Sequence, residues 1–233
     1  MMMSSRQSKT TRTSTPEKKQ FDRYFFGIVI IITILGLFAF VSASLGILAR
    51  SESKFYGVLF NQIVLGFIGG LGVMWLGFTI PYPFWRKYAF FIFIGTLLLT
   101  LAVFIPQLGF SHGGARRWLS LGPLSFQPAE LLKVGFVIYF GAWLSWTRKK
   151  TQEFKYKIAP MLAFVGVIAI VLLKQPDTKS LMLIIIAAAV MLFVSGVSLK
   201  KIGLILFVGA LGITALAFFR PYVMERVQTF LNP

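Results

Sequence analysis

A short polar stretch between two long apolar segments carries the residues best suited to chemistry in this sequence. Glu130 and Lys133 stand three positions apart, so on a helix their side chains share one face and can form an ion pair. Gln127 precedes them by one helical turn. The alternative is that Glu130 only complements a helix N-terminus while Lys133 extends to water. Because charged groups near a bilayer are costly and usually functional, we predict that all three line a substrate-binding cavity.

Two adjacent arginines, Arg116 and Arg117, follow a pair of glycines in the preceding polar segment. Guanidinium groups bind phosphate oxygens through paired hydrogen bonds, so these side chains could hold a diphosphate. Trp118 could rest at the membrane–water interface beside them. The alternative is a loop that only faces lipid headgroups. We include all three residues among the candidate substrate-binding residues.

Asp177 lies between Pro176 and Thr178, where one apolar segment gives way to the next. Aspartate is common at the start of a helix, so a capping role and a role in the same cavity both fit. The chain has no cysteine and a single histidine, which excludes thiol chemistry and a cysteine or histidine metal cluster. We therefore add Asp177 to the candidate substrate-binding residues. No cofactor and no metal-ligand residue is evident, and the use of a divalent cation is left open.

The composition indicates the elements that must position these side chains. Hydrophobic residues make up 57% of the 233 residues and charged residues only 13%, against about a quarter charged in soluble domains. The apolar residues come in blocks of about 20, the length that spans a bilayer as a helix. We therefore predict an all-α, polytopic transmembrane helical bundle, because lipid cannot satisfy open backbone groups.

Seven apolar blocks divide the chain. The predicted spans lie near residues 24–49, 55–80, 88–105, 128–146, 158–173, 181–199 and 202–219. Residues 1–23 read as a disordered basic cytoplasmic tail and 220–233 as the start of an outer loop. We predict a loop over residues 106–127, and we expect Asn61 and Gln62 to hydrogen-bond across helices.

The distribution of positive charge predicts the orientation of the spans. The chain has 24 Lys and Arg residues, and its net charge is +17. With the N-terminus inside, nearly two thirds of these cations fall in inside segments, as the positive-inside rule requires. This orientation places the arginines, segment 174–180 and the C-terminal tail on the outer face. We expect contact with anionic membrane lipid and exclude nucleic acid, since no basic soluble domain exists to bind it.

Several motifs at the span boundaries resemble the SEDS family (shape, elongation, division and sporulation; the FtsW- and RodA-like proteins). The motifs are GARRWL at 114–119, GP at 122–123, QPAE at 127–130 with Lys133, QPD at 175–177, and Arg226 with FLNP at 230–233. The polar N-terminal tail looks more like the division members, those similar to FtsW. The run Thr178-Lys179-Ser180 departs from the Leu-Gly-Thr-like run that usually follows in the family.

The resemblance implies a peptidoglycan glycosyltransferase that polymerises lipid II, a disaccharide-pentapeptide on an undecaprenyl diphosphate carrier. It implies a multi-pass protein of the bacterial cytoplasmic membrane at the division septum, with a class B penicillin-binding transpeptidase and other division proteins as partners. The family's proposed catalytic aspartate lies in a large outer loop after the seventh span. We therefore expect no catalytic residue before Pro233 and no activity from this chain alone.

Two other functions fit the same residues. A lipid II transporter, or flippase, would use the same cavity and arginines to move a diphosphate lipid, although the inverted repeats typical of transporters are not evident. A non-catalytic division scaffold would instead bind its partners through the spans and the tail.

Overall fold

The computed structural model describes residues 23–48, 52–112, 115–121, 124–150 and 153–218. The chain divides into two compact units, residues 1–59 and 60–233. The predicted basic tail lies outside the described residues except for Arg23, and the predicted outer-loop segment 220–233 lies outside them entirely. Across the described ranges the secondary structure is helical apart from one small sheet, so the all-α polytopic class is confirmed.

The first unit contains α1 (Arg23–Leu48) and most of α2 (Glu52–Asn61). The 26 residues of α1 would extend about 39 Å at 1.5 Å per residue, more than the ~30 Å hydrocarbon core of a bilayer. Its sequence is apolar on every side, with Tyr24, Phe25 and Phe38 all exposed. A helix that is hydrophobic all round and exposed is suited to a lipid environment.

The helix that begins with α2 continues into the second unit as a π-helix, Gln62–Ile68, and then as α3 (Gly69–Thr79). The prediction that Asn61 bonds across helices is wrong. Its side chain instead bonds the backbone of Ser125: Nδ2 donates to the carbonyl oxygen and Oδ1 accepts from the N–H, both over 2.9 Å. An asparagine amide carries one donor and one acceptor side, so it can pair with a strand edge much as a neighbouring strand would.

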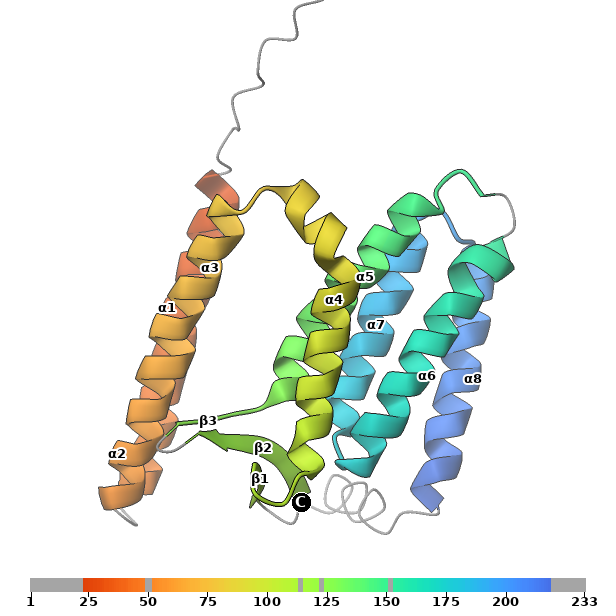
Figure 1. The fold of residues 1–233 in the computed structure, drawn as a ribbon. Coiled ribbons are helices and arrows are strands. Elements are labelled where there is room, and N and C mark those ends of the chain that lie inside the picture. The colour runs from red at the N-terminus through yellow and green to blue at the C-terminus, as the bar shows by residue number, and fades with distance from the viewer. Residues whose placement is uncertain (1–22, 49–51, 113–114, 122–123, 151–152, 219–233) are drawn as a thin grey trace, which may run out of the picture. The chain divides into compact units, whose positions relative to one another are not determined.

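Five helical segments form the packed part of the second unit (Figure 1). They are α4 (Tyr82–Leu101) with a 3₁₀ turn at Ala102–Phe104, α5 (Pro128–Trp146), a π-turn at Phe154–Ile158 with α6 (Ala159–Lys174), α7 (Thr178–Val194) and α8 (Leu199–Phe218). Helix α5 contacts α4 and α7, and α7 also contacts α6 and α8. Short connections make sequential helices antiparallel, so both α5 and α7 begin at the same end of this bundle.

The core of the bundle is centred on α5. Leu132, Phe136, Phe140 and Leu144 recur every four residues and are all buried, which places them on one helix face. The rings of Phe136 and Phe140 stack with centroids 5.5 Å apart. Gly135 lets α4 approach this helix closely, because a Cβ there would collide with the Thr96 hydroxyl. The face of α5 that begins with Ala129 and Leu132 is therefore fixed inward, and this sets the direction of Glu130 and Lys133.

The segment 106–127, which we predicted to be a loop, contains a three-stranded antiparallel sheet. Its strands are β1 (Gly109–His112), β2 (Ala115–Leu121) and β3 (Leu124–Phe126), in the order β1-β2-β3. The strands are too short to give a clear alternating pattern, and the turns between them were the only signal in the sequence. Gly109 is required where β1 begins, since a Cβ there would overlap the carbonyl of Val103.

The start of α4 and the end of α7 differ most from the predicted spans. Helix α4 begins at Tyr82 rather than Tyr88, because Pro83 sits in the first turn, where its missing N–H costs nothing. Helix α7 ends at Val194 rather than near Leu199. Gly196 follows with a φ of 87°, a left-handed conformation that favours glycine, and the N–H of Val197 bonds the carbonyl of Leu192.

Candidate functional site

Two of the predicted site residues meet at the end of the bundle where α5 and α7 begin. Gln127 precedes α5 and Asp177 precedes α7, and the Gln127 amide Nε2 donates to Asp177 Oδ2 over 2.7 Å. Asp177 Oδ1 accepts from the backbone N–H of Ser180 over 3.2 Å, which caps α7. Asp177 is only 2% exposed, and both of its carboxylate oxygens are engaged by these two contacts.

Glu130 and Lys133 form the ion pair that their spacing predicts. Lys133 Nζ lies 2.7 Å from Glu130 Oε2, one turn into α5. The two partners differ in exposure: the Glu130 side chain is 58% exposed and that of Lys133 is 21% exposed. The carboxylate is therefore open to approach from outside the bundle, while its partner ammonium group is more enclosed.

Strand β2 carries the two arginines. Its pairing with β1 is interrupted at Arg117: Phe110 pairs with Trp118 and the next residue, Ser111, pairs with Arg116, so Arg117 is the extra residue of a β-bulge. A bulge redirects the side chain that it carries and interrupts the regular alternation of faces. Both arginines are partly buried.

Arg117 is the unusual member of this strand. It is partly buried, and its Nε has no solvent-exposed surface and no hydrogen-bond partner among the described residues. A buried donor without a partner is rare in folded proteins, and each case calls for an explanation such as a bound ion or ligand. Strand β2 packs against α5 and the turn at 102–104, so this donor lies at the end of the bundle where α5 begins.

Two further polar contacts, which sequence reasoning did not identify, brace the same end. Gln175 is 1% exposed, and its Nε2 donates to the carbonyl of Thr100 over 2.8 Å, which joins the α6–α7 turn to α4. The Asn61 contact with Ser125 holds β3. In the sequence, Gln175 was marked only as the first residue of the QPD motif at 175–177. Some residues of the family-like motifs lie outside the described residues. They are residues 113–114 and 122–123, before and after β2, and residues 226–233 of the C-terminal motif.

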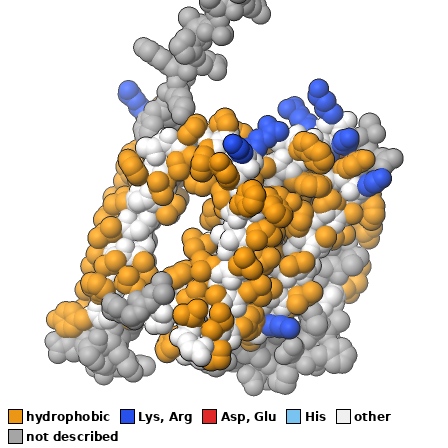
Figure 2. Space-filling view, in the orientation of Figure 1, with side chains coloured by type: hydrophobic (Ala, Val, Ile, Leu, Met, Phe, Trp, Pro, Cys, Tyr) orange, Lys and Arg blue, Asp and Glu red, His pale blue; other side chains and the backbone are white. Residues whose placement is uncertain are grey.

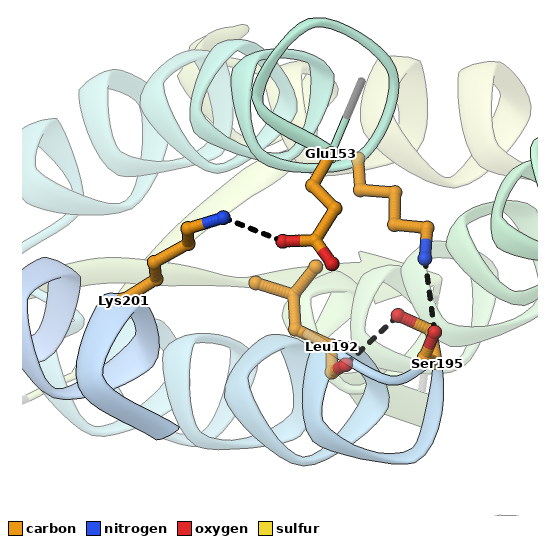
Figure 3. Close-up of polar contacts among 5 residues, drawn as sticks. Glu153, Leu192, Ser195 and Lys201 are labelled. Carbon is orange, nitrogen blue, oxygen red and sulfur yellow. Dashed lines mark hydrogen bonds and ion pairs between the residues drawn. The ribbon is translucent and has the colours of Figure 1, made fainter. Parts of the chain in front are cut away.

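A second polar cluster lies at the opposite end of the bundle (Figure 3). Lys201 Nζ bonds Glu153 Oε2 over 2.7 Å, and Lys157 Nζ donates to the carbonyl of Ser195 over 2.9 Å. The hydrogen bond from Lys201 holds the pKa of Glu153 below its ordinary value. These contacts tie the start of α6 to the α7–α8 turn. In the part of the chain that the structure describes, no three His, Cys, Asp or Glu residues are grouped to hold a metal ion.

These features define a class of protein. Four helices in the described ranges are long and apolar enough to cross a membrane: Arg23–Leu45, Phe55–Thr79, Tyr82–Phe104 and Phe154–Lys174. Helix α7 is a shorter apolar helix. Lysine and arginine side chains gather at one end of the bundle, away from the sheet (Figure 2). The chain is thus a polytopic helical integral membrane protein with a buried polar site at the end that carries fewer cations.

Comparison with known proteins identifies the family. The pattern of the FtsW/RodA/SpoVE family, described as cell cycle proteins, matches residues 22–233. This chain belongs to that family.

Curated proteins with similar sequences carry the name of the same family. A probable peptidoglycan glycosyltransferase FtsW from Geobacter sp. (strain M18) is 32% identical over 213 residues, covering 91% of this chain and 58% of that protein. The corresponding protein of Allochromatium vinosum is 31% identical and covers 94% of this chain and 55% of its own length. The chain therefore spans little more than half the length of these curated relatives.

Solved structures show the same fold. A chain from a peptidoglycan synthase complex, described as coordinating polymerization and crosslinking, matches with a TM-score of 0.68 and 27% identity, over 89% of this chain and 59% of that chain. The rod shape determining protein RodA of Thermus thermophilus matches with a TM-score of 0.62 and 28% identity, over 80% of this chain and 58% of its own.

Proposed function

We propose that this chain works in peptidoglycan synthesis as a glycosyltransferase that polymerises lipid II. Its membership of the FtsW/RodA/SpoVE family supports this, as do relatives named as probable peptidoglycan glycosyltransferases. Lipid II joins a disaccharide-peptide to a long apolar carrier through a diphosphate. A protein that handles it needs a cationic group for the diphosphate beside an apolar surface for the carrier.

The unpartnered Nε of Arg117 is the observation that carries this proposal. Chain extension breaks the bond between a sugar and the carrier diphosphate, so negative charge develops on the leaving oxygen. A guanidinium group can bind phosphate oxygens through two parallel hydrogen bonds, and it stabilises such a charge best where water is excluded. Arg117 has such a donor, buried and without a partner among the described residues, and we assign it to the carrier diphosphate.

The other site residues take different roles in this proposal. Glu130 is exposed and accepts hydrogen bonds, so we assign it to the sugar hydroxyls or peptide of the substrate, with Lys133 holding it in place. Asp177 is buried, and both of its oxygens are engaged. We therefore assign Asp177 and Gln127 to positioning: together they hold the start of α5 in register with the start of α7. No residue named here is proposed as a nucleophile or general base.

The cellular setting follows from the same proposal. Glycan strands are polymerised outside the cytoplasm, so the site would face outward and the cation-rich end would face inward, in keeping with the positive-inside rule. We place the protein in the bacterial cytoplasmic membrane, at the division septum. A class B penicillin-binding transpeptidase is the proposed partner, which would crosslink the strands, and other division proteins would assemble with it.

Lipid II binding tests the proposal directly. The purified chain in lipid nanodiscs should bind fluorescent lipid II about tenfold or more tightly than undecaprenyl monophosphate, because the second phosphate and the sugars add charged and hydrogen-bonded contacts. Equal affinity for the two lipids would contradict the proposal. In proteoliposomes supplied with a class B penicillin-binding protein, a protein that continues this chain through the full length of its FtsW relatives should yield glycan polymer from labelled lipid II. Movement of lipid II across the bilayer with no polymer would instead favour a transporter.

A further inference from the structure

A pocket lies at the opposite end of the bundle from the proposed site. It is an open hollow of about 360 Å³ between the first turns of α4 and the last turns of α5. It is lined by Arg86, Lys87, Phe90, Tyr139, Trp143 and Trp146, together with two alanines. The lining thus combines two cations with four aromatic rings and contains no acidic residue.

The two cations of this pocket have no acidic partner in the part of the chain that the structure describes. Arg86 and Lys87 are both exposed, and neither takes part in an ion pair there. The Nζ of Lys87 lies 5.3 Å from the centroid of the Tyr88 ring. Two adjacent unpaired cations attract an anion, and a guanidinium group is suited to phosphate oxygens.

The aromatic residues supply an apolar wall. Trp146 is 63% exposed and Phe90 is 50% exposed, so large ring surfaces remain uncovered. The indole N–H of Trp143 donates to the carbonyl of Tyr156 over 2.7 Å, which fixes this ring and satisfies its polar group. Trp143 and Trp146 lie together, with centroids 5.4 Å apart. A ligand of this pocket must therefore present apolar surface as well as negative charge.

The position of the pocket along the helices indicates which class of ligand it can bind. Arg86 lies in the first turns of α4, the segment Tyr82–Phe104 that is apolar enough to span a membrane. Trp146 ends α5, and three cations follow it at residues 148–150. Tryptophan and arginine at helix ends mark the level of lipid headgroups. We infer that this pocket is a binding site for an anionic phospholipid, with its phosphate on Arg86 and Lys87 and its acyl chains along Phe90 and Trp146.

Native mass spectrometry of the purified chain with phosphatidylglycerol tests this inference. Wild-type protein should retain the anionic lipid in preference to phosphatidylcholine. The double variant R86Q/K87Q should bind phosphatidylglycerol roughly tenfold more weakly, since each cation near a lipid surface contributes appreciably to its attraction. W146A, which keeps every charge, should weaken binding by about threefold through lost apolar contact.

The matched control is R148Q/K149Q, which removes the same two charges at the same end of the bundle but outside the pocket. It should change phosphatidylglycerol binding by less than about twofold, because general surface attraction is shared among many cations. An equal loss in both double variants would overturn the inference, since it would mean unspecific attraction to a basic surface. Displacement of the lipid by millimolar inorganic phosphate would also overturn it. Thermal unfolding of each variant checks that the fold is intact.

Discussion

The Gln127 side-chain amide donates a hydrogen bond to the Asp177 carboxylate over 2.7 Å, although 50 residues separate the two in the chain. The contact joins the residue before α5 to the residue that caps α7. Because α5 carries Glu130 and Lys133, the orientation of that pair depends on a bond made one helical turn away. The polar end of the bundle is therefore a connected unit.

Replacing Asp177 separates its two contacts. Asp177→Ala should lower the free energy of unfolding by about 1–3 kcal/mol, because it removes a helix cap and leaves the partly buried Gln127 amide unpaired. Asp177→Asn should cost less than about 1 kcal/mol, since asparagine also caps helices and the Gln127 amide can rotate to present its oxygen. Equilibrium unfolding in detergent micelles measures both. Equal losses in the two variants would contradict the assigned geometry.

Exchanging the charges of the ion pair separates structure from function. Glu130→Lys combined with Lys133→Glu keeps a salt bridge at the same spacing, so stability should change by less than about 1 kcal/mol, mostly through a less favourable helix dipole. Lipid II binding should nevertheless fall by about tenfold or more, because the exposed acceptor becomes a donor. The affinity is measured in nanodiscs. If the exchanged pair binds lipid II normally, the pair has only a structural role.

The close approach of α4 and α5 depends on Gly135. Gly135→Ala should destabilise the fold by about 1–3 kcal/mol, because the new methyl group overlaps the Thr96 hydroxyl in a packed interface. Adding Thr96→Ala should recover most of the loss. The matched control is Gly166→Ala in α6, where a Cβ meets no atom within 4 Å; it should be neutral or slightly stabilising through helix propensity. Thermal unfolding of wild type, Gly135→Ala, Gly135→Ala with Thr96→Ala, and Gly166→Ala measures these differences in stability.

The ion pair at the opposite end predicts a pH dependence. The hydrogen bond from Lys201 depresses the folded-state pKa of Glu153, so this group stabilises the fold above its ordinary pKa of about 4.5. That contribution is lost as the pH falls below 4.5 through the folded-state value. Melting temperatures measured between pH 3 and 7 should therefore show a smaller acid-side decrease in Glu153→Gln. An unchanged profile would mean that the pair is not formed in solution.

The sequence was most informative where a single residue type sets a local outcome. Pro128 fixed φ and lacked an N–H, and the helix begins there. The spacing of Glu130 and Lys133 implied a shared face, and the ion pair followed. Both inferences depend only on neighbours within one turn of helix.

Contacts between distant segments were beyond the reach of such rules. The topology predicted from the charge distribution placed Gln127 and Asp177 on one side of the membrane. Their direct bond, however, depends on how α5 packs against α7. The Asn61 bond to Ser125 spans 64 positions and replaced the contact expected between helices. The β-bulge at Arg117 could not be inferred while the segment was read as a loop.

The central claim is that the guanidinium group of Arg117, whose Nε is buried and unpartnered among the described residues, binds the carrier diphosphate. The most direct measurement is the dissociation constant of lipid II for wild type, Arg117→Gln, Arg117→Lys and the control Arg148→Gln, which removes one cation at the opposite end. We predict about tenfold or greater weakening for Arg117→Gln, partial weakening for Arg117→Lys because the planar fork is lost, and no change for the control. Equal affinities of Arg117→Gln and wild type would contradict the claim.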